Sequence, residues 1–292
     1  MMKEDEIRDK ITVVVLTHNR AEELCRTLTH LFALEQLPSI VIVDNCSVDI
    51  TAKQIRSSFP KVTYIRAERN WGAAGRNIGV DFVKTPYVAF CDDDTWWGAN
   101  SLNVAIEILD KHPDISVLNA RILVGPDERL DPACADMENS SLDVIAGVGP
   151  QLTGFMAGAN VMRTIAYQQA NGYWDAFFIG GEETLLAMDI MDSGGKIVYA
   201  PAIVVHHWPS HLRNSTLRER LTIRNAIWTC WLRLPFHLAW QRTRKILSQT
   251  PDRRLRRRAI ADVLLGCHKV MIKRRILRRQ TCELLQRVWA QH

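Results

Sequence analysis

The hydrophobic pattern of the first 110 residues alternates between two periods. Short continuous runs of apolar, mainly β-branched residues predict strands that are covered on both faces, and these runs are residues 11–16, 39–43, 61–66 and 87–91. Helices are predicted between them at 21–34, 47–58 and 73–83. This alternation predicts parallel βαβ units with helices on both faces of one sheet.

The second half of the chain has a less regular pattern. Two further strands and two helices are predicted, at 115–123, 196–205, 182–193 and 216–231. Proline and polar side chains over 125–143 predict a loop. Pro235 ends the last of these helices, and apolar residues at helical intervals beyond it predict a helical tail.

Composition places the chain among ordinary globular proteins. Apolar residues make up 47% of its 292 residues and charged residues 24%, enough for one large domain or a domain with a tail. The seven cysteines are scattered without a CxxC pair, which favours reduced thiols over a disulfide framework or a zinc cluster. No apolar signal core follows the charged N-terminus, and no run of about 18 apolar residues occurs. We therefore expect a cytoplasmic protein.

Charge is distributed unevenly along the chain. Residues 241–292 hold fifteen Arg and Lys against three carboxylates, a net charge of +12, whereas residues 1–240 carry −7. Beside apolar stripes and Trp228, Trp231 and Trp240, such a tail is typical of an interfacial helix on the anionic inner face of a membrane. A solvated tail and an oligomer contact are the alternatives. The tail has no nucleic-acid reading motif, so we expect no nucleic-acid partner.

Three consecutive carboxylates, Asp92 to Asp94, follow the predicted strand 87–91. Carboxylates at the carboxyl end of a parallel strand lie where such sheets bind ligands. Their mutual repulsion favours a bound cation, and oxygen ligands suit Mg²⁺ or Mn²⁺ on a diphosphate. The alternative is a solvated acidic turn or helix cap.

Four other patterns carry candidate chemistry. The glycines of Asn70–Gly79 allow close approach to a ligand, with Arg76 available for a phosphate or a base. Asp44 ends a strand and suits a base or ribose, or caps the next helix. Glu183, after Gly180 and Gly181, suits a general base or a first helical turn. His206 and His207 suit a metal or diphosphate site.

Taken in order, six segments resemble motifs of the inverting family 2 glycosyltransferases, with rhamnosyltransferase-like members among them. They are VVVLTHNR (13–20), VDNCSVD (43–49), NWGAAGRNIG (70–79), FCDDD (90–94), GYWDAFFIGGEE (172–183) and PAIVVHHWPS (201–210). The resemblance covers about residues 11–210. It implies an α/β fold of the GT-A type, with a mostly parallel Rossmann-like sheet and helices on both faces.

The resemblance also implies a division of the chain. Residues 1–210 would form the GT-A domain, with a nucleotide-binding half over about 11–110 and an acceptor and catalytic half over about 111–210. Residues 211–292 would form a basic helical extension.

Carried over residue by residue, the resemblance implies a role for each site residue. The nucleotide would be bound by Thr17, Asn19, Arg20, Asp44, Arg76 and Asp92. Asp94 and His207 would hold Mg²⁺ or Mn²⁺, and Glu183 would be the base, with Glu182 as its rival. We further expect Gly158, Trp174 and Asp175 to shape the sugar or acceptor site.

The sequence departs from the family pattern on the acceptor side. The base position holds Glu where Asp is more usual, and Leu185 and Leu186 stand where the family often continues with charged residues. The expected reaction is inverting transfer of a sugar from a UDP- or dTDP-linked donor. Its acceptor would be a glycan or lipid-linked hydroxyl in polysaccharide, O-antigen or other glycoconjugate synthesis.

Two other functions stay open. One is a nucleotidyltransferase with a similar sheet, which would lack the carboxylate base and release pyrophosphate. The other is a catalytically silent module that binds membranes or anions, against which Asp92, Asp94 and Glu183 argue. The oligomeric state is left open.

Overall fold

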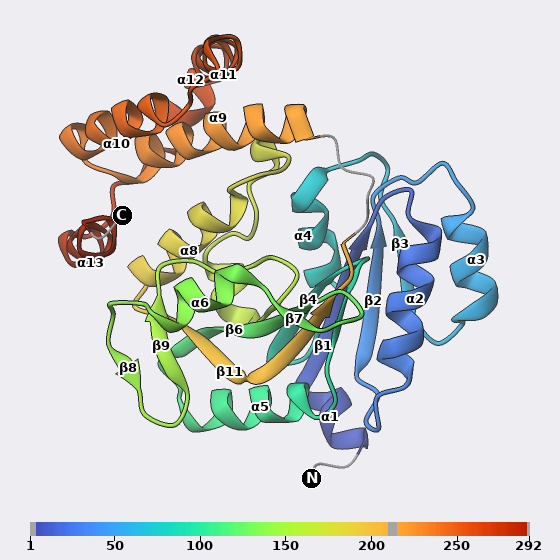
Figure 1. The fold of residues 1–292 in the computed structure, drawn as a ribbon. Helices are drawn as coiled ribbons and strands as arrows, with labels where there is room; N and C mark the ends of the chain where they lie inside the picture. The colour runs from blue at the N-terminus through green and yellow to red at the C-terminus, as the bar shows by residue number, and fades with distance from the viewer. Residues whose placement is uncertain (1–3, 210–214, 291–292) are drawn as a thin grey trace.

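A computed structural model describes residues 4–209 and 215–290 of the chain. Its centre is one eleven-stranded sheet (Figure 1). The first half of that sheet is parallel, in the order β3 (Thr63–Arg66), β2 (Ser39–Asp44), β1 (Ile11–Thr17) and β4 (Tyr87–Asp92). These strands match the predicted ones to within two residues, so the apolar runs located them correctly.

Helices connect these strands and cover the sheet. They are α1 (Glu4–Lys10), α2 (Ala21–Phe32), α3 (Thr51–Ser58), the 3-10 turn η1 (Gly72–Ala74), α4 (Gly75–Val80) and α5 (Ser101–Lys111). All residues of β1 except Leu16 are buried, although their side chains alternate between the two faces. The expectation that both faces of the sheet are covered is therefore confirmed.

The second half of the sheet is mixed. Antiparallel β10 (Asn160–Arg163) lies between β4 and β6 (Ile115–Val124), and β11 (Lys196–His207) then runs parallel to β6. Four short strands add antiparallel pairs: β5 (Thr95–Trp97), β7 (Arg129–Leu130), β8 (Val144–Ile145) and β9 (Gly149–Leu152). The pairs between the longer strands are thus mostly parallel, as predicted, whereas the four short strands pair antiparallel.

The prediction of a loop over 125–143 was wrong in part. Besides β7, this segment contains α6 (Pro132–Glu138). Asp131 caps the helix by accepting a hydrogen bond from the backbone N–H of Ala133 at 2.9 Å, and Pro132 occupies the first helical position. Both are favourable helix-start signals.

The basic tail is helical, as predicted. After α7 (Thr164–Gln169), the 3-10 turn η2 (Asp175–Phe177) and α8 (Glu182–Asp192), the described residues beyond β11 form five helices. They are α9 (Ser215–Arg233), α10 (Phe236–Ser248), α11 (Arg253–Leu265), α12 (Cys267–Lys273) and α13 (Arg279–Trp289). In Figure 1, α9 to α12 lie at the end of the molecule opposite the N-terminus.

These helices share their cores with the rest of the protein. One apolar cluster joins Met188 of α8 to Leu234, Leu238 and Leu277. A second joins Phe177 and Leu185 to Trp228, Leu232 and Val270. The boundary expected after residue 210 lies outside the described residues, and stays a prediction. Within the described residues, no helix is long and apolar enough to cross a bilayer.

Candidate functional site

A cavity of about 530 Å³ opens at the carboxyl ends of β1, β2 and β4. Strand register brings these ends together, because Thr17 pairs with Asp44 and Leu16 with Asp92. Eight residues expected at the site line this cavity: Thr17, Asn19, Arg20, Arg76, Asp92, Asp94, Glu182 and Glu183. Ligand binding at this edge is usual for open α/β sheets.

The three consecutive carboxylates point in different directions. The carboxylate of Asp92 forms an ion pair with Arg76. Asp93 turns inward, where it accepts hydrogen bonds from the Thr17 hydroxyl and from Arg20 Nη1, each at 3.0 Å. Asp94 lies 3.4 Å from the same Arg20 nitrogen. Two arginines thus neutralise part of this charge, while the charges of Asp94 and Asp92 still raise the pKa of Asp93. The expected cation stays a prediction.

Asp93 is a buried structural residue. Only 5% of its surface is exposed, and burial raises the pKa of its carboxyl group to about 7 against the opposing effect of Arg20. Its backbone carbonyl accepts a hydrogen bond from the Thr27 hydroxyl of α2 at 2.8 Å. Asp93 thus fixes the loop that presents its two neighbours to the cavity.

Asp92 faces the cavity beside a glycine. A Cβ atom at position 158 would lie only 2.7 Å from Asp92 Oδ2, so Gly158 leaves the space that this carboxylate occupies. Arg76 is buried, and burial alone would lower the pKa of its guanidinium group. The charge of Asp92 is the main cause that outweighs burial, so the pKa is raised. Arg76 therefore acts in this structure as the partner of Asp92.

A divalent cation at the ends of β4 and β11 would have two protein ligands, Asp94 and His207. His207 Nε2 lies 3.7 Å from Asp94 Oδ1, and β5 brings β11 next to this loop. No group of three or more His, Cys, Asp or Glu side chains within 4–209 and 215–290 has the geometry of a complete metal site. A site of one carboxylate and one imidazole, completed by diphosphate oxygens and water, nevertheless fits the way Mg²⁺ binds in nucleotide sites.

Asp44 lies beneath the cavity and does not line it. It has no exposed surface, and it accepts hydrogen bonds from the backbone N–H of Ser47 at 2.7 Å, from Arg66 Nη1 at 3.1 Å and from the Tyr64 hydroxyl. Asn45, the next residue, lines the cavity and ties β2 to the glycine segment, because its Nδ2 donates to the Gly72 carbonyl at 2.8 Å.

Glu182 and Glu183 open α8 on the opposite wall. Gly181 precedes them with φ of 82°, a left-handed conformation that favours glycine. The pKa of Glu183 is raised by burial and then by the negative charge of Glu182, and burial also raises the pKa of Glu182. One buried and one half-buried carboxylate, both with raised pKa values, thus lie next to each other in the cavity wall.

The sequence analysis missed several residues of the cavity wall. Phe178 and Ile179 precede the glycines, and Arg218 comes from α9, which had been assigned to the extension. No sequence signal places Arg218 here, because it reaches the cavity only through the packing of α9 on α8. The Arg218 charge acts on Glu182, where it lowers the pKa against the effect of burial.

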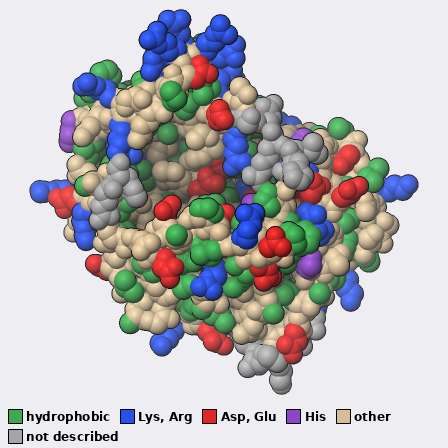
Figure 2. All heavy atoms as spheres, in the orientation of Figure 1, with side chains coloured by type: hydrophobic (Ala, Val, Ile, Leu, Met, Phe, Trp, Pro, Cys, Tyr) green, Lys and Arg blue, Asp and Glu red, His purple; other side chains and the backbone are tan. Residues whose placement is uncertain are grey.

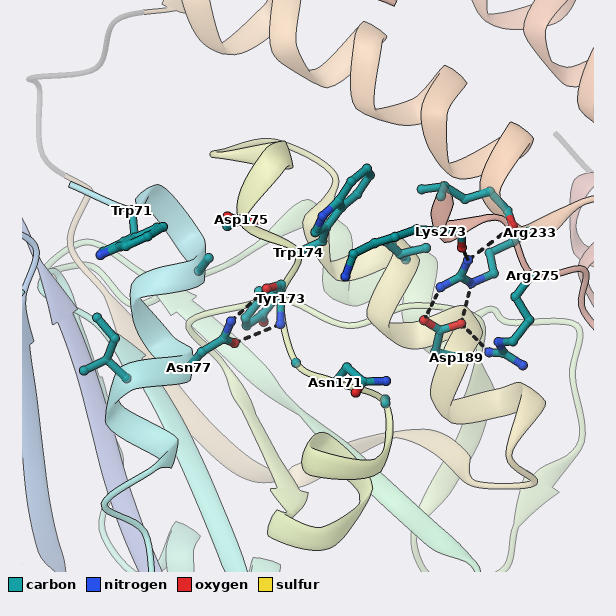
Figure 3. A pocket seen from close by; sticks show the side chains of 16 residues that line it. Trp71, Asn77, Asn171, Tyr173, Trp174, Asp175, Asp189, Arg233, Lys273 and Arg275 are labelled. Carbon is teal, nitrogen blue, oxygen red and sulfur yellow. Dashed lines mark hydrogen bonds and ion pairs between the residues drawn. The ribbon is translucent and has the colours of Figure 1, made fainter. Parts of the chain in front are cut away.

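Trp174 and Asp175 lie elsewhere. They line a second cavity, of about 630 Å³, together with Trp71, Asn77, Asn171 and Tyr173 (Figure 3). The turn η1 separates the two cavities, because Gly72 and Ala73 line the first while Trp71 and Ala74 line the second.

Comparisons with known proteins identify the family of this chain. The model of the family "Glycosyl transferase family 2" matches residues 12–167, more than half of the chain. A pre-mycofactocin glycosyltransferase of Mycobacterium tuberculosis is 26% identical over 72% of this chain, which spans only 45% of that relative. The N-acetylglucosaminyl-diphospho-decaprenol L-rhamnosyltransferase of the same organism is 23% identical over 70% of this chain and 77% of its own.

Solved structures show the same fold. TarS of S. aureus, in complex with UDP-GlcNAc, superposes with a TM-score of 0.66 over 87% of this chain and 79% of its own, at 15% identity. The mannosyltransferase PcManGT from Pyrobaculum calidifontis, in complex with GDP-Man and Mn²⁺, gives 0.62 over 97% and 80%, at 16% identity. The sheet is GT-A-like, and the family model matches more than half of the chain. This chain therefore belongs to glycosyl transferase family 2.

Proposed function

We propose that this protein transfers a sugar from a nucleotide-sugar donor to an acceptor hydroxyl with inversion at the anomeric carbon. The observation that carries this proposal is the single cavity that joins the strand-end carboxylates Asp92 and Asp94 to the carboxylates of α8. Two carboxylate groups on opposite walls suit a single displacement, in which one wall holds the leaving diphosphate and the other takes the acceptor's proton.

Glu183 is the proposed base. Its raised pKa, caused by burial and by Glu182, lets it hold a proton in the pH range where most enzymes work. The negative charge of Glu183 in turn raises the pKa values of Tyr173 and Arg76. Glu182 remains the alternative base, because its Oε2 is buried without a hydrogen-bond partner among the described residues.

Asp94 and His207 are the residues proposed to hold a divalent metal. When bound, Mg²⁺ or Mn²⁺ would neutralise charge on the departing nucleotide diphosphate. Arg20 pairs with Asp94 and so limits the negative charge of the site. The PcManGT complex holds GDP-Man with Mn²⁺, and the TarS complex holds UDP-GlcNAc. These two complexes support a divalent ion and a nucleotide-sugar donor, for which we propose UDP or dTDP as the carrier.

Nucleotide binding gives the first test. Thermal unfolding is followed with UDP, dTDP and GDP, each with and without Mn²⁺, for the wild type, Asp94→Asn and the control Asp114→Asn, an exposed carboxylate paired with Lys196. We expect one nucleotide to raise the unfolding midpoint only with Mn²⁺, in the wild type and the control but not in Asp94→Asn. Equal stabilisation of Asp94→Asn would contradict the metal role, and no effect of any nucleotide would contradict the donor proposal.

We also propose that the C-terminal helices dock on an anionic membrane. Large apolar side chains are exposed on α10 to α12, among them Trp240, Leu265 at 78% and Ile272 at 81%. Exposed arginines of α11 lie in the same region, where Figure 2 shows Lys and Arg gathered at one end of the molecule. Exposed apolar side chains beside cations are typical of interfacial helices. Trp228, expected to contribute, is buried at 4%, and Trp231 is half-buried.

Vesicle sedimentation tests the docking proposal. Arg253, Arg254, Arg257 and Arg258 are exposed, so their joint replacement by Gln leaves the core intact. Each basic residue contributes about 1 kcal/mol at an anionic surface, so we expect this variant to lose at least a hundredfold in binding to phosphatidylglycerol vesicles. Replacing Lys53, Lys61, Arg69 and Lys84 by Gln, all exposed and far from the tail in sequence, should change binding little. Equal binding by both variants would contradict the proposal.

A further inference from the structure

The segment that precedes the proposed base contains a strained turn. Phe178 has φ of 62° and ψ of −66°, and the N–H of Ile179 donates a hydrogen bond to the carbonyl of Phe177 at 2.8 Å. This geometry is that of a γ-turn with positive φ at its centre, which is rare and strained. A strained residue keeps its conformation only where the surrounding structure holds it, and such residues cluster at functional sites.

This turn belongs to the wall of the first cavity. Phe178 and Ile179 line that cavity together with Glu183, which follows Phe178 by five positions in the chain. Gly180 and Gly181 lie between them with φ of 90° and 82°, and Gly181 is the residue at which α8 begins. The direction in which the chain leaves the turn therefore determines where the first turn of α8 carries its carboxylates.

One buried side chain of α9 holds this turn. Asn225 has no exposed surface, and its Nδ2 donates to the carbonyls of Phe177, Ile179 and Gly180 at 3.0, 3.1 and 2.7 Å. Its two N–H groups are thus shared among three carbonyls on both sides of the strained Phe178. Buried carbonyls outside helices and strands need donors from elsewhere, and Asn225 supplies them.

The neighbouring Arg224 completes this contact. Its Nη2 donates to the carbonyls of Ala176 and Phe177 at 2.9 and 2.8 Å, and its Nε donates to Asn225 Oδ1 at 2.9 Å. Because an arginine side chain can only donate, this last contact determines which end of the Asn225 amide faces the turn. The Arg224 guanidinium group is itself placed over the ring of Trp228, 4.4 Å from its centre.

The glycine segment holds the turn from the nucleotide side. The N–H of Ala73 donates to the Phe178 carbonyl at 2.7 Å. A Cβ atom at position 72 would lie 1.9 Å from the same oxygen, so Gly72 permits this close approach. A Cβ atom at Gly180 would likewise lie 2.3 Å from Thr222 Oγ1 of α9. The turn is therefore fixed between η1, at the nucleotide site, and α9, in the C-terminal extension.

We propose that Asn225 is a positioning residue of the catalytic wall, which holds the turn at Phe178 and so determines where Glu183 lies relative to the donor. This inference rests on the proposed transferase function and adds a residue of α9 to it, outside residues 12–167 that the family model matches. Asn225 does not line the cavity, so it acts through the backbone that it holds.

Hydrogen–deuterium exchange of the full-length protein tests this hold without requiring turnover. Asn225→Ala removes the amide. Thr229→Ala is the matched control, because Thr229 lies one turn further along α9, is 2% exposed, and has a hydroxyl without a hydrogen-bond partner among the described residues. We expect peptides that cover residues 176–184 to exchange about tenfold faster or more in Asn225→Ala, and at the wild-type rate in Thr229→Ala.

Donor hydrolysis tests the effect on the base. UDP release from UDP-glucose and UDP-GlcNAc is measured with Mn²⁺. Since a small misplacement of a catalytic group can cost about a hundredfold in rate, we expect kcat of Asn225→Ala to fall about 10- to 100-fold. The donor KM and the UDP affinity should stay unchanged, because the residues proposed to bind the nucleotide are intact. Thr229→Ala should keep all three values.

Equal exchange of residues 176–184 in the two variants would overturn the assignment, and so would faster exchange with an unchanged kcat. Exchange alone decides where the wild type hydrolyses neither donor. Should Asn225→Ala lack a cooperative thermal transition, Asn225→Ser, which keeps one donor at a shorter reach, is measured against the same outcomes. Failure of the donor proposal is distinguishable, because UDP binding is then absent from the wild type while the exchange difference between the variants persists.

Discussion

At the scale of single residues, the site consists of carboxylates whose environments differ. Asp92 and Asp94 are paired with Arg76 and Arg20, and Asp93 is buried among Thr17 and Arg20. Glu183 has no comparable ion pair among the described residues and lies beside a second carboxylate. These environments suit different tasks: the carboxylate of Asp94 suits a cation, and Glu183, whose pKa is raised, suits proton transfer.

Single replacements of Glu183 and Glu182 by Gln distinguish the proposed base from the neighbouring carboxylate. Glu183→Gln removes the proposed proton acceptor, so we expect kcat to fall by about 10²–10⁴-fold while UDP affinity is kept. In Glu182→Gln the negative charge that raises the pKa of Glu183 is gone. That pKa then falls, Glu183 stays deprotonated at lower pH, and the acidic limb of the kcat profile moves to lower pH.

The pH profiles of both variants decide between the two carboxylates. If Glu182→Gln loses activity at every pH while Glu183→Gln keeps it, the roles are reversed. An unmoved acidic limb in Glu182→Gln would contradict the electrostatic coupling.

At the scale of elements, α8 connects the candidate base to the C-terminal helices. Its first turn carries Glu182 and Glu183, and its last turns carry Asp189 and Asp192. Asp192 accepts hydrogen bonds from Arg275 Nη1 at 2.7 Å and from the Thr281 hydroxyl at 2.9 Å. Carboxylates near a helix C-terminus oppose the helix dipole, and the arginines from the following helices compensate for this.

Removal of the Asp189 charge tests how much this connection stabilises the protein. The Asp189 and Arg233 side chains are 9% and 10% exposed, so Asp189→Asn leaves a buried arginine without its counter-ion. We expect a loss of about 3–5 kcal/mol in the free energy of unfolding, measured in urea. Asp114→Asn breaks the exposed pair with Lys196 and should cost less than about 1 kcal/mol. Equal losses in both variants would show that the Asp189 pair is no stronger than a surface pair.

At the scale of the whole molecule, the extension and the catalytic part form joint cores. Val270 of α12, Leu277 of the following linker and Leu285 of α13 are nearly fully buried, in clusters that include Leu185 and Met188 of α8. Gly266 lies so close to the Trp228 ring that a Cβ atom there would collide with it. The extension is therefore a part of the folded structure as well as a candidate docking surface.

A chain that ends at residue 250 tests this view. It lacks α11 to α13 and loses the three buried side chains just named, each of which stabilises the fold by about 1.5–3 kcal/mol. This sum is comparable to the total stability of a typical domain, about 5–15 kcal/mol. We expect the cooperative thermal transition followed by near-UV circular dichroism to be lost. A transition with an unchanged midpoint would show that the extension folds separately.

Local patterns in the sequence predicted much of the fold. The apolar runs located β1 to β4, because a strand buried on both faces leaves a continuous signal. The resemblance predicted the GT-A-like architecture and selected eight residues that line one cavity. What could not be predicted depends on distant contacts: the two arginines that pair with Asp92 and Asp94, the burial of Trp228 under α12, and the entry of Arg218 into the wall. Helix α6 had a readable cap at Asp131, which the polar composition of its surroundings obscured.

The ion pairs at the far end of α8 have a consequence for how this chain can vary. Without the arginines of the extension, eleven residues of helix would carry four carboxylates and no basic residue. A chimera that joins residues 1–210 to a different C-terminal extension would retain these four carboxylates without the arginines that compensate for them. We therefore expect Asp189, Arg233 and Arg275 to be inherited together, and a chimera to require either all three or none.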